Sequence, residues 1–346
     1  MNKKIKIYGA GSIGNHLAFS SVYLKNSVEV VDSDPNALKR MKDQIYPSRY
    51  KKWNKKIKLT SKKNDTDFSH DFYFIGTPPN SRISILKKIL ESKLIPKGIL
   101  IEKPITTSSS KNISELQKVV KKLISKKINI YCGYNHSVSH SFIYFLKELN
   151  NYKSNKILSI ESNWNETTDG ILSAHSWLPD IYSSYLGSYK DGGGSIHEHS
   201  HGLHLFIYLL NFLKLKLTGS YKKNQIINSS NNFRHDYLSN LQINGDNGII
   251  YKINTDFYTY PAQKNIKIQF QNFRLEIHFS TFNNHDEVYL YSSDKIIKKV
   301  FKKTRKDDFT VEIKHILGIS KISEYRDSPL NLKYGLNVMQ FINKNF

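Results

Sequence analysis

The first third of the chain alternates two patterns of hydrophobic and polar positions. Short apolar runs are each followed by a stretch in which apolar residues recur at helical spacing, as Ile113, Leu116, Val120 and Leu123 do. This alternation is typical of βαβ units in a parallel sheet. It predicts helices at residues 14–24 and 113–124, the second capped by the serines before it, and strands at residues 4–8, 28–31, 72–75, 99–101 and 128–131.

The pattern changes after about Tyr134, where strands joined by turn residues replace the βα rhythm. Residues 238–243 and 249–257 flank Asn244–Gly248, a strong hairpin signal, and residues 265–279 continue it. An antiparallel sheet is therefore expected in this half of the chain.

Two more helices are expected there, an apolar, buried one at residues 203–213 and a closing one at residues 331–346. With 346 residues the chain is long for one hydrophobic core. We predict an α/β protein with two domains. Residues 1–133 would form a Rossmann domain with a doubly wound parallel sheet, and residues 134–346 an α+β domain with an open, mostly antiparallel sheet, whose last helix packs back on the first domain.

Composition limits the classes of protein that the chain can belong to. Hydrophobic residues make up 39% of it, and no run approaches the roughly 18 uninterrupted apolar residues of a membrane span. The basic start is followed by glycines and polar residues where an export signal would be apolar. A single cysteine, Cys132, fits a reducing compartment. We expect a cytoplasmic protein without a membrane partner.

The net charge of +23 comes from 52 basic and 29 acidic residues, with lysines spread from Lys3 to Lys344. Such an even distribution of lysines is typical of a solvated basic surface. We therefore expect no nucleic-acid partner. A positive field of this kind attracts phosphorylated or carboxylated metabolites.

The sequence G-x-G-x-x-G stands between the first predicted strand and its helix. Glycines in this pattern allow a tight turn, close approach of the backbone to a pyrophosphate, and packing of helix against strand. Asp32 ends the second strand, where a carboxylate accepts hydrogen bonds from an adenosine ribose and repels a 2′-phosphate. This favours NAD as cofactor, with NADP left open by the nearby Arg40. The predicted cofactor residues of this loop are Gly9, Gly11, Ser12, Ile13 and Gly14.

Two further loops leave predicted strands at their carboxyl ends, where ligands of open parallel sheets bind. Thr77, Pro78 and Asn80 follow one strand, and Glu102 and Lys103 end another. We expect all five to line the cofactor site. Lys103 would act as a general acid or base if burial and the positive charge of the cofactor lower its pKa.

The densest polar cluster in the chain runs from the triple glycine at 192–194 to His204. We expect these glycines to let a ligand approach closely. Imidazole side chains as a class change protonation near neutral pH, so His201 would shuttle a proton, with a carboxylate one turn away to orient it.

With these motifs the chain resembles the glucose-fructose oxidoreductase, inositol dehydrogenase and rhizopine-catabolism family over nearly its whole length. The resemblance implies a nicotinamide-dependent oxidoreductase acting on a sugar, sugar derivative or cyclitol, with surface-polysaccharide sugar biosynthesis as one setting, and a homodimer or homotetramer. The motifs in order are Gly9–Gly14, Thr77–Pro79, Glu102–Pro104 with Gly133–His136, Ser176–Asp180 and the triple glycine.

The resemblance also implies roles for individual residues. Lys103 matches the family's catalytic lysine, and His201 matches the histidine that ends the triple-glycine motif. Glu198 stands in the place of the usual aspartate, and His197, one helical turn before His201, competes for that role. The implied substrate contacts are Asn135, His136, Trp177 and Asp180.

Two alternative functions stay open at this point. His197–His201 is a literal H-E-x-x-H, the pattern of zinc hydrolases. No acidic third ligand stands between Leu205 and His235, and three glycines precede the motif, a poor setting for the middle of a helix. We therefore predict no metal. The other alternative is a non-catalytic cofactor-binding sensor of the same fold, which the presence of Lys103 and His201 disfavours.

Overall fold

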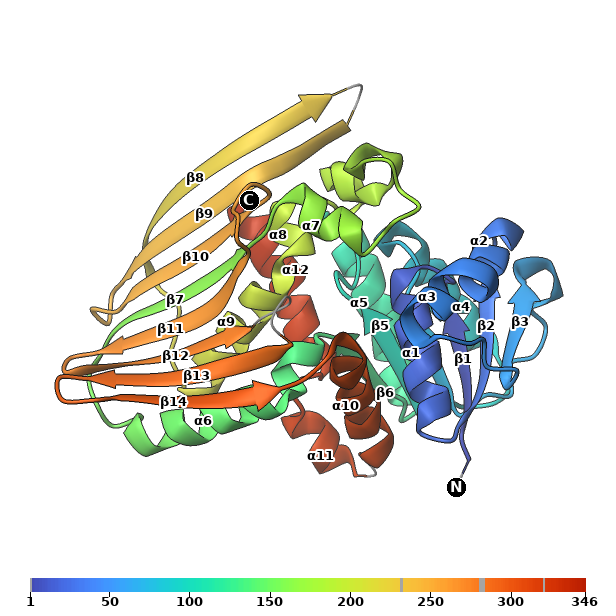
Figure 1. The fold of residues 1–346 in the computed structure, drawn as a ribbon, viewed down its shortest axis with the longest axis horizontal. Coiled ribbons are helices and arrows are strands. Elements are labelled where there is room, and N and C mark those ends of the chain that lie inside the picture. Colours follow the sequence, from blue (N-terminus) through green and yellow to red (C-terminus); the bar gives the residue numbers. More distant parts are fainter. Residues whose placement is uncertain (1, 231–232, 280–283, 320) are drawn as a thin grey trace. The chain divides into compact units, whose positions relative to one another are not determined.

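The computed structural model describes residues 2–230, 233–279, 284–319 and 321–346, and the chain forms two compact units (Figure 1). Unit 1 comprises Met1–Asn135 and Lys306–Gly335, and unit 2 comprises His136–Arg305 and Leu336–Phe346. The chain therefore passes from unit 1 to unit 2, returns to unit 1, and ends in unit 2.

Unit 1 is built on a six-stranded parallel sheet with the order β3-β2-β1-β4-β5-β6. This order is doubly wound, because the strands proceed outward from β1 in both directions. All residues of β4 and β5 are buried, as expected for strands covered on both faces. The predicted Rossmann-type sheet is thus confirmed, with strands β1 Lys4–Tyr8, β2 Ser27–Asp32, β3 Ile57–Ser61, β4 Phe72–Ile75, β5 Gly98–Glu102 and β6 Asn129–Gly133.

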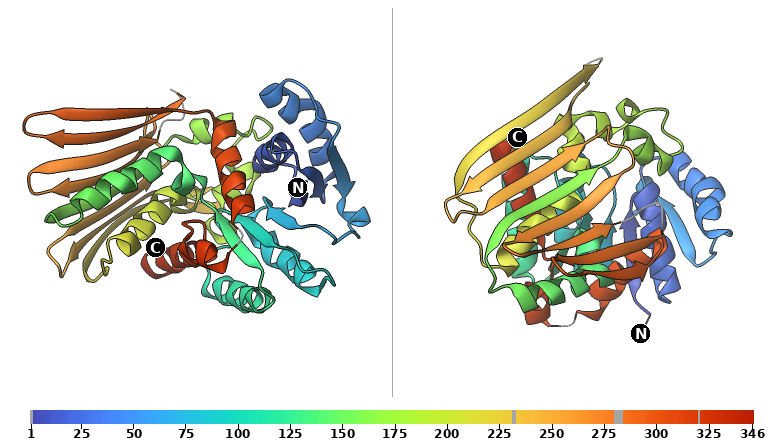
Figure 2. Two further views of the ribbon diagram at one scale, coloured as in Figure 1. Left: turned by 90° about the horizontal axis from the view of Figure 1, so that it is seen from below. Right: turned by 60° about the vertical axis from the view of Figure 1, so that its left-hand side comes forward.

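Helices lie on both faces of this sheet (Figure 2). The helix predicted from the spacing of its apolar residues is α5, whose apolar stripe is buried and whose N-cap, Ser109, accepts a hydrogen bond from the Asn112 N–H. The helices of unit 1 are α1 Ser12–Tyr23, α2 Pro35–Arg40, the π-helix η1 Met41–Ile45, α3 Tyr46–Tyr50, α4 Arg82–Glu91, α5 Ser110–Ser125, α10 Arg305–Gly318 and α11 Ile322–Asp327, with the 3₁₀ turns η2 Lys62–Asn64 and η3 Pro79–Ser81.

Unit 2 is built on an eight-stranded sheet with the order β14-β13-β12-β11-β7-β10-β9-β8. Its neighbouring strands are antiparallel except β7 and β10, which are parallel, so the predicted mostly antiparallel sheet is confirmed. The segment 265–279, predicted to continue the first hairpin, forms a second one that turns at Gln271. The strands are β7 Ile157–Asn165, β8 Gly219–Ser230, β9 Phe233–Gly245, β10 Ile250–Asp256, β11 Gln263–Phe270, β12 Phe273–Phe279, β13 His285–Ser292 and β14 Ile296–Lys302.

Helices α6 and α9 pack on one face of this sheet (Figure 2). That face carries apolar side chains such as Ile253 and Ile266, which are almost fully buried. The opposite face carries an amide ladder, in which Asn254 donates to Asn163 and Asn163 donates to Asn265. The helices of unit 2 are α6 His140–Tyr152, α7 Thr168–Ser173, α8 Ser195–Glu198 and α9 Ser200–Phe212, with the 3₁₀ turns η4 Asn135–Val138, η5 Ile181–Ser183, η6 Tyr185–Gly187 and η7 Tyr189–Asp191; α12 Leu332–Asn345 belongs to both units.

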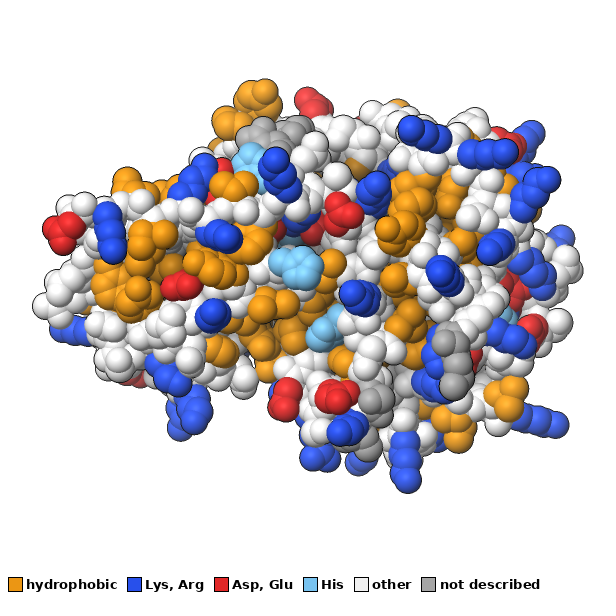
Figure 3. Space-filling model, turned by 60° about the horizontal axis from the view of Figure 1, so that its bottom comes forward, with side chains coloured by type: hydrophobic (Ala, Val, Ile, Leu, Met, Phe, Trp, Pro, Cys, Tyr) orange, Lys and Arg blue, Asp and Glu red, His pale blue; other side chains and the backbone are white. Residues whose placement is uncertain are grey.

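Two surface properties bear on function. Within the described ranges, no helix combines the length and the apolar character needed to cross a membrane. Lysine and arginine side chains are scattered over the face shown in Figure 3 and do not gather in one patch.

Candidate active site

The glycine loop, Gly9–Gly14, connects β1 to α1. Gly9 has φ +104°, and a Cβ there would lie 3.0 Å from the backbone of Gly76. A Cβ on Gly14 would lie 1.9 Å from the carbonyl oxygen of Gly9. The first position therefore needs glycine for its conformation, and the second for the packing of α1 against the loop.

Gly11 has a different reason to be glycine. A Cβ there would meet nothing within 4 Å in the described chain. Among the described residues, no side chain caps the N-terminus of α1, and its first turn holds no acid. The start of this helix thus combines amide N–H groups that no side chain caps with a backbone position, Gly11, beside which there is open space. This arrangement fits the diphosphate of a dinucleotide, which needs N–H donors and close backbone approach.

Asp32 ends β2 and lies against the glycine loop. Its carboxylate accepts hydrogen bonds from the Ala10 N–H at 2.7 Å and from the Asp34 N–H at 2.9 Å. These two bonds fix the carboxylate, and each of its oxygens retains a second lone pair. The carboxylate is therefore fixed beside the glycine loop, with acceptor capacity left on both of its oxygens.

Arg82 joins the two loops that follow β4 and β5. It is only 2% exposed, and its Nε donates to the Thr77 carbonyl at 2.8 Å. Its Nη1 donates to the carbonyls of Glu102 and Pro104. The sequence analysis missed this residue, because an arginine at the start of α4 carries no sign of its two distant partners. Arg82 holds the two predicted cofactor loops together.

Lys103 is half-buried and follows directly after β5, and the Lys103–Pro104 peptide is cis. Glu102, the last residue of β5, is buried against β6, where a Cβ on Gly133 would lie 2.6 Å from its carboxyl carbon. Because the strands are parallel, their carboxyl ends lie at one edge of the sheet. The glycine loop, Asp32 and Lys103 therefore share that edge.

The remaining predicted residues of unit 1 differ in exposure. The Thr77 hydroxyl accepts a hydrogen bond from Ser81 at 2.8 Å, whereas Pro78 and Asn80 are exposed in the same loop. Asn135 is buried at the end of the unit. Thr77 thus takes part in the loop structure, while Pro78 and Asn80 are accessible to a ligand.

In unit 2 the triple glycine is packed against this chain's own atoms. A Cβ on Gly193 would lie 2.1 Å from the Tyr185 carbonyl oxygen. Gly194 has φ +91°, and its Cβ would lie 2.1 Å from Oδ1 of Asp236. The expectation that these glycines admit a ligand is wrong at both positions, because protein atoms already occupy the space.

Asp236, on β9, fixes the start of α8. It is fully buried, and its Oδ2 accepts hydrogen bonds from the Ser195 hydroxyl at 2.5 Å, the Ile196 N–H at 2.9 Å and the Ser239 hydroxyl at 2.8 Å. Because α8 carries His197 and Glu198, Asp236 positions the segment that the motif singled out. An acid within a strand otherwise patterned for burial was the only sequence signal for it.

The H-E-x-x-H segment does not form the helix that a zinc site requires. Helix α8 ends at Glu198 and α9 begins at Ser200, so His197 and His201 lie on different helices. The Nδ1 of His197 lies 2.8 Å from the Gly193 carbonyl oxygen, and its ring packs edge-on against Tyr189. The prediction that His197 lies one helical turn from His201 is therefore wrong, since the break at His199 separates them.

His201 belongs to a cluster of rings on the helix-covered face of the sheet. Its ring stacks on Trp164 with 5.7 Å between centroids and meets His136 edge-on at 4.9 Å. His136 also contacts Phe279 at 5.0 Å. Two predicted residues, His136 and His201, are thus brought together.

Buried ion pairs accompany this cluster. Lys264 pairs with Glu166 at 2.7 Å, with side chains 9% and 12% exposed. Lys303 pairs with the fully buried Asp286 at 2.9 Å. Burial lowers the pKa of Lys264, although the charge of Glu166 opposes this. The sequence analysis did not single out any of these four residues. The two lysines gave no signal, because lysines are too common in this chain to stand out.

His136 makes the stability of the protein depend on pH. Burial, followed by the charges of Lys303, His201, Arg305 and Lys264, holds its pKa well below its ordinary value of 6.5. Between the two pKa values the unfolded chain binds a proton that the folded protein does not, so stability falls as pH drops below about 6.5.

We expect His136→Phe, which keeps a ring in the cluster, to flatten the fall in unfolding free energy between pH 7 and pH 5. One such group contributes up to about 1.4 kcal/mol per pH unit. Urea denaturation at pH 7 and pH 5 measures the free energy of unfolding at each pH. The control is His140→Phe, because His140 is exposed. An unchanged pH dependence in His136→Phe would show that His136 does not titrate as inferred.

The other predicted residues of unit 2 lie outside the ring cluster described above. Asp180 is exposed and caps η5, because its side chain accepts hydrogen bonds from the N–H and hydroxyl of Ser183. Trp177 is half-buried and packs edge-on against His175. Glu198 is half-buried at the end of α8.

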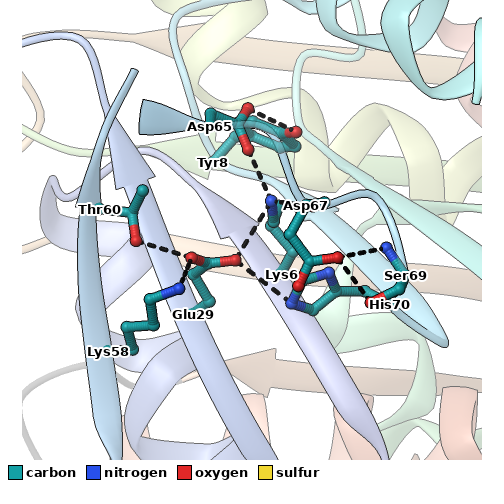
Figure 4. Close-up of polar contacts among 9 residues, drawn as sticks. All are labelled: Lys6, Tyr8, Glu29, Lys58, Thr60, Asp65, Asp67, Ser69 and His70. Carbon is teal, nitrogen blue, oxygen red and sulfur yellow. Dashed lines mark hydrogen bonds and ion pairs between the residues drawn. The ribbon is translucent and has the colours of Figure 1, made fainter. Parts of the chain in front are cut away.

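Unit 1 also contains a buried ionic cluster (Figure 4). Lys6, in the middle of β1, pairs with Glu29 at 3.1 Å and Asp65 at 2.6 Å and is itself 0% exposed. Within the described chain, Glu29, Asp67 and His70 form the one group with the spacing of metal ligands. The Lys6 ammonium already supplies positive charge to Glu29, so we interpret the group as an ionic core of the unit.

No protein-family model matches the sequence, and no curated protein matches it. Solved structures share its fold. The UDP-N-acetylglucosamine 3-dehydrogenase GnnA from Acidithiobacillus ferrooxidans is 12% identical, with a TM-score of 0.68 and coverage of 99% of this chain and 96% of that chain. The WlbA dehydrogenase from Bordetella pertussis, in complex with NADH and UDP-GlcNAcA, is 14% identical, with a TM-score of 0.66 and coverage of 99% and 95%. KijD10, a 3-ketoreductase from Actinomadura kijaniata in complex with NADP and TDP-benzene, is 10% identical, with a TM-score of 0.70 and coverage of 99% and 96%.

Proposed function

We propose that the protein is an NAD(P)-dependent oxidoreductase that transfers hydride between nicotinamide and a hydroxyl or ketone carbon of a sugar or sugar derivative. The observation that carries this proposal is the glycine loop, open at Gly11, with Asp32 bonded to its backbone. The shared fold supports it, since GnnA and WlbA are named dehydrogenases and WlbA holds NADH and a nucleotide-linked sugar.

The proposal assigns a role to each part of unit 1. The N–H groups of the glycine loop bind the diphosphate, and Asp32 binds the adenosine ribose. Thr77, Pro78 and Asn80 line the cofactor site together with Glu102 and Lys103. A bound nicotinamide supplies the hydride acceptor, and orientation of the reacting carbon contributes much of the rate.

Lys103 is proposed to take the proton of the carbinol hydroxyl while hydride leaves the same carbon, and to return it in the reverse direction. His201, in unit 2, is the second candidate for this proton, with Glu198 or His197 as the group that orients it. Asn135, His136, Trp177 and Asp180 are proposed to contact the substrate. The proposal also places the protein in the cytoplasm as a homodimer or homotetramer.

The first test is a titration of the purified protein with NADH and NADPH, followed by nicotinamide fluorescence. The same titrations are carried out on Gly11→Val, whose side chain enters space that is open in the folded chain. The wild type should bind NADH more tightly than NADPH, because the Asp32 carboxylate repels a 2′-phosphate. Gly11→Val should lower the affinity for NADH at least about tenfold, a loss of about 1.4 kcal/mol in binding free energy. Thermal stability should stay unchanged.

Gly318→Val is the matched control, since a Cβ at Gly318 also meets nothing within 4 Å in the described residues of the chain. It should bind NADH as the wild type does. Wild-type protein that binds neither nucleotide, or a Gly11→Val variant with undiminished affinity, would refute the proposed function.

A further inference from the structure

Arg82, the first residue of α4, is bonded to the backbone of the segment that carries Lys103. Its Nη1 donates to the carbonyls of Glu102 and Pro104, and its Nη2 donates a long hydrogen bond of 3.5 Å to the Lys103 carbonyl. Arg82 is only 2% exposed, so water competes little for these bonds. The backbone around Lys103 is therefore fixed by a side chain that lies 21 residues earlier in the sequence.

The same guanidinium is bonded to the neighbouring loop, which follows β4. Its Nε donates to the Thr77 carbonyl at 2.8 Å. The Ser81 hydroxyl braces this loop, because it lies 2.8 Å from the Thr77 hydroxyl and 2.9 Å from the Pro78 carbonyl. Since β4 and β5 are adjacent parallel strands, the two loops leave the same edge of the sheet side by side. Arg82 thus joins the loop predicted to contact the cofactor to the segment that carries Lys103.

This set of bonds requires an arginine. A guanidinium holds five N–H donors in one plane, and Arg82 uses Nε and both terminal nitrogens. A lysine ammonium places its three donors at one point, and an amide side chain offers two. Without the guanidinium, carbonyls in at least one loop would lose their donor, and the two loops would no longer be held to each other.

We propose that Arg82 is a positioning residue for hydride transfer, which holds Lys103 at a fixed place relative to the nicotinamide. The proposal rests on the proposed function, which supplies the nicotinamide and the role of Lys103. Arg82 acts through backbone carbonyls, and the Lys103 side chain carries the proton. Placement matters because a shift of about 1 Å in a reacting group costs about 10²-fold in rate.

The test uses the two oxidation states of the nicotinamide as probes of where the Lys103 ammonium lies. The nicotinamide ring is positively charged in NAD⁺ and neutral in NADH, so a nearby ammonium weakens NAD⁺ selectively. Removing one ammonium lowers the positive potential at the ring whatever other charges lie nearby. The quantity measured is the ratio of the two dissociation constants, with NADH followed by its fluorescence and NAD⁺ by competition with NADH.

The full chain is compared as wild type, Lys103→Ala, Arg82→Lys and the double variant. Arg82→Lys keeps the charge of the side chain but cannot bond to both loops. Lys87→Met is the matched control, since Lys87 lies on the same helix, is 50% exposed and pairs with Glu115. Thermal unfolding shows whether each variant is folded, and Arg82→Gln replaces Arg82→Lys if the latter does not fold.

We expect Lys103→Ala to strengthen NAD⁺ binding relative to NADH at least about fivefold. Arg82→Lys should change the ratio in the same direction by at least about twofold, but should change nothing further in the Lys103→Ala background. With the sugar that a substrate screen identifies, Arg82→Lys should lower kcat about 10- to 100-fold, and less than about twofold in the Lys103→Ala background. Lys87→Met should behave as the wild type in both measurements.

Three results would overturn the assignment and leave the proposed function standing. One is an unchanged ratio in Arg82→Lys while Lys103→Ala shifts it. Another is an equal shift with and without Lys103, which would mean that Arg82 acts on the cofactor and not through Lys103. The third is an unchanged ratio in Lys103→Ala, because Lys103 would then not lie beside the nicotinamide and Arg82 could not serve to place it there. Failure of the wild type to bind NADH would instead remove the proposed function itself.

Discussion

Lys6→Met should lower the free energy of unfolding by about 3–5 kcal/mol, the usual cost of removing one partner from a buried ion pair. Lys6 is 0% exposed and lies between the carboxylates of Glu29 and Asp65 (Figure 4). Methionine keeps an unbranched stem in the same space but removes the charge. Asp65 then loses the cation that Lys6 supplies and Glu29 loses its buried one, and this effect can be measured by urea denaturation at pH 7.

Lys58→Met is the matched control, because Lys58 pairs with the same carboxylate of Glu29 at 2.8 Å. Its side chain is 68% exposed, so its loss should cost less than about 1 kcal/mol. Equal losses in the two variants would show that burial does not decide the strength of these pairs.

The same ionic cluster predicts how the stability difference between the wild type and Lys6→Met depends on pH. Burial alone would raise the pKa of Glu29, but hydrogen bonds from Lys58 and Thr60 and the charge of Lys6 outweigh it and lower the pKa below 4.5. The stability that Glu29 contributes is therefore present above pH 4.5 and lost as pH falls through its folded pKa. The gap between wild type and Lys6→Met should narrow over that range.

Periodic patterns allowed much of the fold to be predicted from the sequence. Strand β1 was expected at residues 4–8 and occupies Lys4–Tyr8, and the stripe of α5 lies where its spacing indicated. Such elements are predictable because each is encoded by several residues close in sequence. The glycine loop could be predicted for the same reason, since the positions that need glycine lie close together in the sequence.

Single residues that act over long sequence separations could not be predicted. Arg82 donates to backbone carbonyls of two loops, Asp236 fixes the start of a helix, and Arg49 reaches Ser12. Each is one polar residue in an unremarkable local pattern, and its importance depends on which partner the fold brings to it. Lys6 is the clearest case, because a lysine in the middle of β1 contradicts the apolar pattern unless its acidic partners are known.

The break between α8 and α9 was missed for a related reason. Apart from Ile196, the residues from Ser195 to His201 are polar, so there was no apolar stripe to test for continuity, and the literal H-E-x-x-H suggested one helix. The start of α8 is instead determined by Asp236, which lies on a distant strand. Tertiary contacts therefore override the local pattern in the segment that mattered most for function.

Lys103→Ala should lower kcat by about 10²- to 10⁴-fold, the range that a positioned general acid or base contributes. Lys103 follows β5 directly, and Arg82 holds the backbone around it through the carbonyls of Glu102 and Pro104. Because that support comes from backbone atoms, alanine should leave the loop in place. The affinity for NADH should therefore change by no more than about twofold, well under 1 kcal/mol.

Lys97→Ala is the matched control, since Lys97 precedes the opposite end of β5, is 59% exposed and pairs with Asp71. Its kcat should equal that of the wild type with whichever sugar or nucleotide-linked sugar a substrate screen identifies. The pH dependence of kcat should lose one limb in Lys103→Ala, because the group that transfers the proton is gone. Wild-type turnover in Lys103→Ala would mean that another group, with His201 as the next candidate, takes the proton. A large loss of NADH affinity would mean that Lys103 serves the cofactor and not the transfer of the proton.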